Sequence, residues 1–267
     1  MSKVKFQNKM VDPDTVWSDW FTTSAFGVDK RLRHVFQMLP EDPRCKFCNV
    51  PFQGVGGILA RTVFRKQRST LNPRFCNMCD EAARRFPGGA EVPMAMLFVD
   101  IRGATALSET MSPTEFSQLI NRFYVASTRA IVAEDALVEK LAGDAVAAFW
   151  GAGFAGPDYV QRTVKVAQKL LHVMAQQAIP VGIGVHSGVA FFGVVGTVDG
   201  LTNISAIGDE VNKAARLGSE ARAGEIIVSE AALQRAGIDG SPLEARSLVL
   251  KGISEPVAVR VMTRQTA

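Results

Sequence analysis

The sequence predicts an α+β fold in which a small cysteine-rich module precedes a ferredoxin-like sheet with helices on one face. Two observations predict it. From about residue 93 onward, apolar runs typical of buried strands alternate with stretches of helical periodicity in the order strand, helix, strand, strand, helix, strand. All four cysteines lie before that point, in two C-x-x-C pairs. We expect an N-terminal helical segment at 1–40, a four-cysteine module at 41–86, a linker at 87–92 and a larger domain at 93–267.

The charge of the chain is uneven. The net charge is +4, yet residues 1–90 hold 15 Lys and Arg against 8 Asp and Glu. A basic first third could contact nucleic acid, an anionic surface or the acidic remainder of the chain, and we favour the last. No apolar run approaches the roughly 20 residues of a membrane helix, and the N-terminus lacks a signal-peptide core. We therefore expect a cytoplasmic protein without a membrane span.

Two short helices are expected before the first cysteine. The first follows the start signal Asp12-Pro13-Asp14, and the second runs from Asp29 to Met38. Both carry apolar side chains at helical spacing. Because helices this short are unstable alone, each must pack on the rest of the chain.

The cysteines form two paired knuckles, Cys45 with Cys48 and Cys76 with Cys79. Each C-x-x-C turn brings two thiolates within reach of one tetrahedral ion, so the module predicts a bound metal. We favour Zn²⁺. An iron-sulfur cluster is the alternative, because it takes the same four ligands. Stable disulfides are not expected in a cytoplasmic protein.

The larger domain begins with an apolar run that ends in Asp100, and a hairpin over LVEKLAGDAVAAFW places Asp144 near its tip. A desolvated carboxylate must be paired or bind a cation. The two acids therefore make a candidate site for two Mg²⁺ or Mn²⁺ ions. The turn at Gly103, Ala104 and Thr105 opens a helix and offers backbone amides to a triphosphate.

The remaining elements are expected in this order: a helix from Ser112-Pro113, a helix over about 158–176, a strand pair over 179–195, a helix over 208–221, a strand over 226–229 and a hairpin around 251–252. Asn212 and Arg216 are four residues apart on the fourth of these elements and share one helix face. Together they suit orientation of a ribose and stabilisation of a transferring phosphoryl group.

Four ordered segments resemble the class III nucleotidyl cyclase catalytic domain, and the resemblance covers about Pro93 to the C-terminus. The segments are FVDIRGATAL, EKLAGDAVAAF, VGIGVHSGVAFFGVVG and AIGDEVNKAARL. The resemblance implies an adenylate cyclase, a signalling lyase. In its reaction the ribose 3'-oxygen attacks the α-phosphorus of ATP and yields 3',5'-cyclic AMP and pyrophosphate.

The resemblance also implies roles for single residues. Asp100 and Asp144 would hold the metal ions, with the carbonyl of Ile101 near the second. Lys140 matches the lysine that selects the base, and Ser205 stands where its partner is found. Lys140 can donate to N1 of adenine, so ATP is expected. The Ser205 hydroxyl can donate or accept, which would loosen discrimination against GTP.

The same resemblance assigns Asn212 to the ribose, Arg216 to the pentacovalent transition state and Lys251 to the triphosphate. In this family each active site lies between two catalytic domains. Because one chain here carries the full set, we expect a homodimer with two equivalent sites.

Alternative functions remain open. Guanylyl or pyrimidine cyclase activity is one. A nucleic-acid-binding zinc protein with a degenerate cyclase domain is another. It is supported by the basic first third and by Phe52, Phe64 and Phe75, which lie in or beside the basic loop between the two cysteine pairs. Nucleic acid is the less favoured partner, because the acids, Lys, Asn and Arg of the cyclase motifs are all present.

Overall fold

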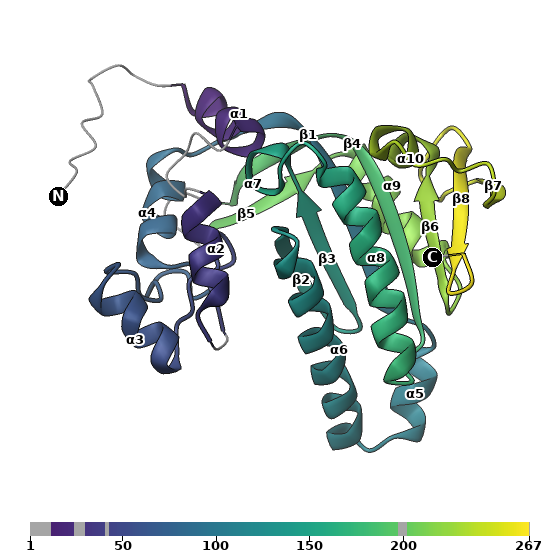
Figure 1. The fold of residues 1–267 in the computed structure, drawn as a ribbon, viewed down its shortest axis with the longest axis horizontal. Coiled ribbons are helices and arrows are strands. Elements are labelled where there is room, and N and C mark those ends of the chain that lie inside the picture. The colour runs from purple at the N-terminus through teal and green to yellow at the C-terminus, as the bar shows by residue number, and fades with distance from the viewer. Residues whose placement is uncertain (1–11, 24–29, 41–42, 197–201, 267) are drawn as a thin grey trace.

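The computed structural model describes residues 12–23, 30–40, 43–196 and 202–266 (Figure 1). The helices are α1 (Pro13–Thr23), α2 (Lys30–Met38), α3 (Gly54–Thr62), α4 (Asn77–Arg85), α5 (Ala104–Thr110), α6 (Pro113–Ala133), α7 (Ala152–Ala155), α8 (Tyr159–Gln176), α9 (Asp209–Glu220) and α10 (Glu230–Ala236). The strands are β1 (Gly89–Ile101), β2 (Leu137–Ala142), β3 (Ala145–Trp150), β4 (Val181–Gly196), β5 (Thr202–Ile207), β6 (Glu225–Ser229), β7 (Glu244–Leu248) and β8 (Val257–Thr263). Within the described ranges, no helix has the length and apolar character needed to cross a bilayer.

One sheet organises the chain, in the order β2-β3-β1-β4-β6-β8-β7, with β5 paired to β4. The four strands β2, β3, β1 and β4 pair antiparallel and, with α6 and α8 as crossovers, form the expected ferredoxin-like unit. β6 joins β4 in parallel, and the β7–β8 hairpin extends that edge. The predicted α+β class is confirmed.

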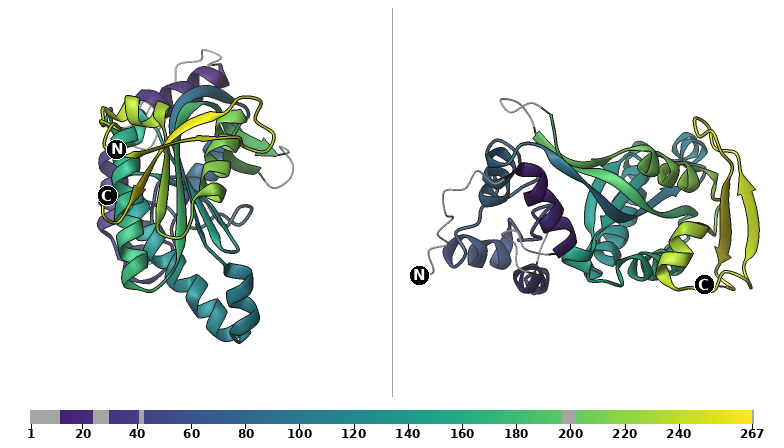
Figure 2. Two further views of the ribbon diagram at one scale, coloured as in Figure 1. Left: turned by 90° about the vertical axis from the view of Figure 1, so that its right-hand side faces the viewer. Right: turned by 90° about the horizontal axis from the view of Figure 1, so that it is seen from above.

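Helices cover both faces of this sheet, and the expectation of helices on one face was wrong. Side chains of successive strand residues point to opposite faces. On β4, a Cβ at Gly184 would meet Gly218 of α9, so the even-numbered residues face α9. Odd-numbered Ser187 instead accepts a 3.2 Å hydrogen bond from Arg235 of α10. Figure 2 shows α8 and α9 on opposite sides of the sheet.

The stretch 179–195, expected as a strand pair, contains most of one continuous strand, β4, of 16 residues. Gly182, Gly184 and Gly188 lie within this strand. A Cβ at Gly184 or Gly188 would collide with α9, and one at Gly182 would collide with Ala221 at the end of that helix. Glycine is required at these positions for the close approach of the helix, as is common for glycines inside strands.

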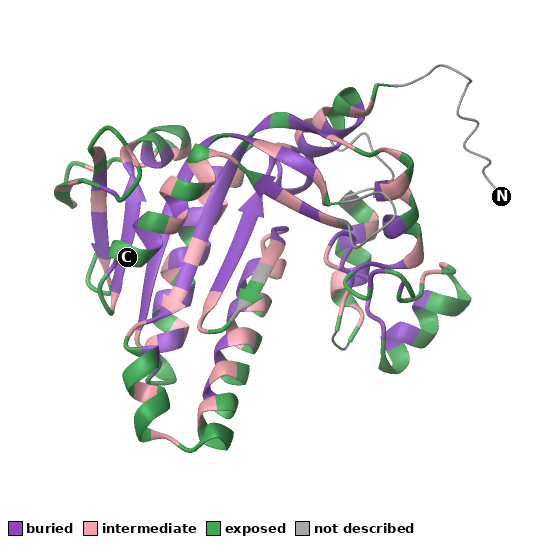
Figure 3. Cartoon of the chain, turned by 180° about the vertical axis from the view of Figure 1, so that it is seen from behind, coloured by how far each residue is buried: buried purple, intermediate pink, exposed green. Residues whose placement is uncertain are grey.

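The amphipathic helix α6 begins as its sequence predicts. Ser112 accepts from the backbone of Glu115, whose carboxylate accepts in turn from the backbone of Ser112, forming a capping box. Pro113 occupies the first turn. The C-terminal part of α6 packs on the sheet, whereas α5 and the first turns of α6 project beyond it and are exposed (Figure 3).

The N-terminal helices share one hydrophobic core with the sheet. Trp20 of α1 stacks on Phe47 of the cysteine module, with ring centroids 4.0 Å apart, and on Phe192 of β4 at 5.6 Å. The expected linker at 87–92 differs in the structure, because Gly89 to Val92 pair with β4 as the start of β1. Buried Ala90 and Val92 alternate there with exposed Glu91, which is a strand pattern.

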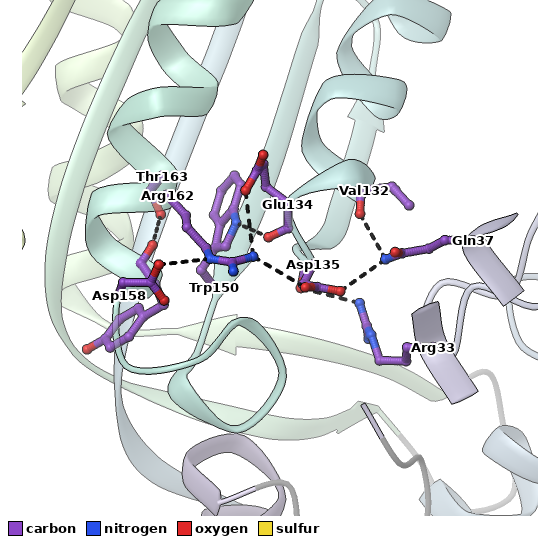
Figure 4. Close-up of polar contacts among 10 residues, drawn as sticks. Arg33, Gln37, Val132, Glu134, Asp135, Trp150, Asp158, Arg162 and Thr163 are labelled. Carbon is purple, nitrogen blue, oxygen red and sulfur yellow. Dashed lines mark hydrogen bonds and ion pairs between the residues drawn. The ribbon is translucent and has the colours of Figure 1, made fainter. Parts of the chain in front are cut away.

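Helix α2 docks where α6 ends and β2 begins (Figure 4). The buried Arg33 guanidinium donates to the carbonyls of Asp135 and Ala136, at 3.4 and 3.2 Å. Gln37 donates to the carbonyl of Val132 at 2.9 Å and to the carboxylate of Asp135 at 3.2 Å. The N-terminal segment is therefore fixed to the residues that lead directly into β2.

Candidate active site

The two predicted metal acids lie together at one end of the sheet. Asp100 is near the end of β1 and pairs with Ala145, the first residue of β3. The turn before β3 carries Asp144, whose carbonyl accepts a 2.9 Å hydrogen bond from the amide of Ile101. Antiparallel pairing places the end of one strand beside the start of its neighbour, which explains the juxtaposition.

Electrostatics at this end favour a bound cation. Burial, together with the charge of Asp144, raises the pKa of Asp100 to about 6 despite the opposing Arg102 guanidinium. Arg102 forms an ion pair with Asp100 and donates 2.8 Å hydrogen bonds to the carbonyls of Gly218 and Ser219 in α9. The Arg102 guanidinium offsets only part of the effect of burial, because the pKa of Asp100 remains raised. A donor set of two carboxylates fits Mg²⁺ or Mn²⁺.

The predicted phosphate-binding turn adjoins these acids. Gly103 precedes α5 with φ of +71°, a conformation that side chains with a Cβ rarely adopt. Ala104 and Thr105 line a hollow of about 420 Å³ together with Gly143 and Asp144. The turn and the second acid therefore open onto one space.

Tyr124 of α6 also lines this hollow, and its hydroxyl donates a 2.7 Å hydrogen bond to the carbonyl of Gly143. The bond fixes the hairpin turn that carries Asp144. In the sequence, Tyr124 stands out only as one member of the apolar stripe of its helix. The signal that could have identified it is a phenol at a core-facing position, since a phenolic hydroxyl in such a place usually has a partner.

The residues expected to read the base lie on β2 and β5. Lys140 pairs with Ala147 through its backbone, and its side chain lies outside the described part of the structure. Ser205 of β5 donates a 2.8 Å hydrogen bond to Oε1 of Glu139, the residue before Lys140. The structure therefore places Ser205 beside the strand that carries the predicted base-selecting lysine. Glu139 was not predicted.

Helix α9 presents Asn212 and Arg216 on one exposed face, as predicted. Its first turn is held by His186 of β4, whose ring nitrogens lie 2.5 Å from Glu210 and 2.7 Å from Ser229. Burial lowers the pKa of His186, although Glu210 opposes that shift. His186 thus orients the helix that carries the two candidate residues.

Lys251 is exposed in the connection between β7 and β8. The following residue, Gly252, lines a hollow of about 540 Å³ with Glu210 and Lys213 of α9. The connection therefore stands over the first turn of α9. Within one chain, the predicted residues therefore lie in three groups: one around the two acids, one on β2 and β5, and one around α9.

The four cysteines form one buried cluster whose sulfurs all lie within 4.8 Å of one another. Sγ of Cys48 and Sγ of Cys76 are 3.7 Å apart, too far for a disulfide. Ligands at about 2.3 Å from a tetrahedral zinc ion lie about 3.8 Å apart, so the spacing fits such an ion. The cluster could hold a metal.

Neighbouring donors support thiolates in this cluster. The amide of Cys76 donates to Sγ of Cys45 at 3.2 Å, and Nζ of Lys66 lies 3.9 Å from Sγ of Cys76. Burial alone would lower the pKa of Lys66, but the four cysteines raise it above its ordinary value. A positive charge beside the cluster is therefore stabilised.

Comparison with known proteins adds to this geometry. The family model described as the adenylate and guanylate cyclase catalytic domain matches residues 90–252. An adenylate cyclase of Anabaena cylindrica is 29% identical over 182 residues, which is 62% of this chain and 36% of that protein. An uncharacterised protein of Mycobacterium tuberculosis is 29% identical over 185 residues, 66% of this chain and 34% of that protein. The chain thus spans about a third of the length of these curated relatives.

Two solved structures resemble the fold. The guanylyl cyclase Cya2 superimposes with a TM-score of 0.59 at 26% identity, over 65% of this chain and 93% of that one. The adenylyl cyclase CyaB from P. aeruginosa superimposes with a TM-score of 0.57 at 26% identity, over 67% of this chain and 98% of that one. The matched residues, 90–252, include seven of the eight described strands, both acids and α9, and this chain therefore belongs to the family of adenylate and guanylate cyclase catalytic domains.

Proposed function

We propose that this protein is an adenylate cyclase that converts ATP into 3',5'-cyclic AMP and pyrophosphate at a site shared by two chains. One observation carries the proposal furthest: Asp100 and Asp144 meet at one end of the sheet, beside the turn at Gly103. Because the chain belongs to the cyclase family, we assign that pair of acids to binding the catalytic metal ions. We place the enzyme in the cytoplasm, with the cysteine module at 41–86 preceding the catalytic domain.

Asp100, Asp144 and the carbonyl of Ile101 would hold two Mg²⁺ or Mn²⁺ ions. When bound, such ions neutralise the phosphates and promote ionisation of the attacking hydroxyl. The ribose 3'-oxygen forms a bond to the α-phosphorus, the bond from that phosphorus to the bridging oxygen breaks, and pyrophosphate leaves. The proton of the 3'-hydroxyl passes to solvent.

The chain's other residues would bind and orient the substrate. Lys140 and Ser205 contact the adenine, and Asn212 positions the ribose for in-line attack. Arg216 stabilises the charge that develops on the transferring phosphoryl group. Lys251 reaches the triphosphate, as does the backbone at 103–105.

Several features support a homodimer. Asn212 and Arg216 are exposed on α9, as expected for side chains whose partner groups come from a second chain. Val189 and Ile207, on the arm formed by β4 and β5 that carries Ser205, are exposed apolar residues. Exposed apolar surface beside a functional site is typical of an interface. In a symmetric dimer each chain would contribute to two equivalent sites.

In the cysteine module we propose one structural Zn²⁺ bound by Cys45, Cys48, Cys76 and Cys79, with an iron-sulfur cluster as the alternative. The module's basic loop has less to support nucleic-acid binding than the sequence suggested. Phe52 and Phe75 are buried in the core, so these rings do not offer a stacking surface.

The test is product formation by the purified full chain with Mn²⁺ or Mg²⁺ and each of ATP, GTP, CTP and UTP, resolved by chromatography. We expect cyclic AMP from ATP, and its loss in Asp144→Ala. Cyclic GMP as the main product would support the second candidate, a guanylyl cyclase. One observation favours that candidate: the Glu139 carboxylate lies beside Ser205 and could accept from the N1–H of guanine.

A further inference from the structure

Lys46 connects the cysteine module to the side of the catalytic domain that we propose reads the base. Lys46 lies between Cys45 and Phe47 in the first knuckle. Its Nζ donates to Oε2 of Glu139 at 2.6 Å and to the carbonyl of Ile204 at 2.8 Å. The side chains of Lys46 and Glu139 are only 6% and 11% exposed. A charge pair withdrawn from solvent in this way holds both partners in one geometry.

Glu139 stands at an irregularity in its strand. On β2, Val138 pairs with Ala148 and Lys140 pairs with Ala147, so Glu139 is the extra residue of a bulge. Bulges redirect a side chain and are frequent beside active sites. Here Glu139 points toward β5, where its Oε1 accepts the 2.8 Å hydrogen bond from Ser205.

The direction of that hydrogen bond determines what Ser205 can offer to a ligand. An ionised carboxylate only accepts hydrogen bonds, and a serine hydroxyl has one hydrogen with two acceptor lone pairs. The hydrogen of Ser205 is therefore committed to Glu139, and Ser205 presents only an acceptor. Adenine carries a donor at its 6-position, the amino group. Guanine and hypoxanthine carry an acceptor there, the 6-oxo group, which an acceptor-only Ser205 cannot bind.

We propose that Glu139 is a positioning residue that sets base selectivity: it fixes the Ser205 hydroxyl as an acceptor for the 6-amino group of adenine, with Lys46 holding its carboxylate in place. This inference rests on the proposed function, which puts Ser205 against the base. It replaces the loose discrimination expected from a free hydroxyl by a defined preference. It also makes base selection depend on a residue of the cysteine module.

The variant Glu139→Gln tests this polarity. Lys46 donates only, so it orients the glutamine with its carbonyl toward Nζ and its amide NH₂ toward Ser205. The hydroxyl of Ser205 then accepts from the glutamine and turns its hydrogen to the base, where it suits a 6-oxo group. ATP and inosine triphosphate both lack a 2-amino group, so comparing them limits the difference to N1 and the 6-position.

We compare kcat/KM for ATP with kcat/KM for inosine triphosphate. Glu139→Gln should lower the ratio of the first to the second by about tenfold, equivalent to about 1.4 kcal/mol. In a Ser205→Ala background the same change should leave the ratio constant. Glu91→Gln, at an exposed position of β1, is the matched control. Equal loss for both nucleotides in Glu139→Gln, or the same shift without Ser205, would overturn the inference.

Calorimetric binding of 3'-deoxy-ATP and 3'-deoxy-inosine triphosphate gives a readout that needs no turnover. Selective binding that inverts in Glu139→Gln, without cyclic product from any nucleotide, would support the inference and defeat the proposed function. Preference of the unaltered protein for 6-oxo nucleotides, lost in Glu139→Gln, would mean that Glu139 contacts the base directly and would overturn it. Absence of binding by both analogues would overturn both.

Discussion

Replacing Lys46 by methionine removes one charge from the buried pair that connects the two parts of the chain. Loss of one partner from a buried ion pair costs about 3–5 kcal/mol, because the remaining charge is left without compensation. In this variant Glu139 keeps its 2.8 Å hydrogen bond from Ser205, and Nδ2 of Asn203 lies 3.5 Å from Oε1 of Glu139. We therefore expect the lower end, about 3 kcal/mol of unfolding free energy. Burial lowers the pKa of Lys46 although Glu139 opposes the shift.

The double variant Lys46→Met with Glu139→Gln separates charge from packing. With the carboxylate neutralised, the loss should fall to about 1 kcal/mol, the usual contribution of the hydrogen bond from Lys46 to the carbonyl of Ile204. The double variant should thus lose about 2 kcal/mol less than Lys46→Met alone, a departure from additivity well beyond the scatter of independent pairs.

Urea unfolding followed by tryptophan fluorescence measures both changes, at one fixed protein concentration because a dimer is expected. Trp17 and Trp20 pack against Phe192 of β4, and Trp150 is buried in β3, so the signal reports both separation of the N-terminal segment and unfolding of the sheet. Lys165→Met, at an exposed position of α8, is the control. A loss below about 1 kcal/mol in Lys46→Met, or additive effects in the double variant, would refute the pair as a buried contact.

Three further predictions follow from the described geometry. Because the pKa of Asp100 is raised to about 6, the metal-free protein should lose stability relative to Asp100→Asn as pH rises from about 4 to about 6, while its Mn²⁺ binding strengthens; thermal melts of both proteins with and without Mn²⁺ test this, and a pH-independent difference between them would contradict the raised pKa. Gly184→Ala places a methyl group 2.7 Å from Cα of Gly218 and should cost about 1–3 kcal/mol with a fall in kcat, since α9 must move; full stability and activity would argue against this packing. Elemental analysis should find one zinc per chain that is lost in Cys48→Ser, and a brown protein containing iron would replace zinc by a cluster.

Local sequence signals predicted much of the fold. The start of α6 at Ser112-Pro113, the helix over 158–176 and the final hairpin each depend on neighbours in the chain, and each is present. The strand pair expected over 179–195 failed for a reason that is not local. Gly182, Gly184 and Gly188 allow a close approach of backbones, and a helix that passes over the strand makes that approach, not a second strand.

The residues of the candidate site also differ in whether local sequence or distant contacts determine their role. Asp100 and Asp144 could be paired from sequence because each ends or interrupts an apolar run. Glu139 could not be identified, because its role depends on a bulge that shifts register by one residue and on Lys46, which is 93 positions away. Arg102 was equally hidden, since its partners at the end of α9 lie more than a hundred residues further along the chain.

The most direct test of the shared active site is complementation between two inactive variants. Asp100→Ala removes a metal ligand and Arg216→Ala removes the group that stabilises the transition state, so each homodimer should lack cyclase activity. Mixing equal amounts and allowing subunits to exchange should restore activity, because half of the chains then form dimers with one intact site. Up to about a quarter of the activity of the unaltered protein is the expected recovery from random pairing. No recovery, with mixed dimers demonstrated by mass spectrometry, would contradict a site built from two chains.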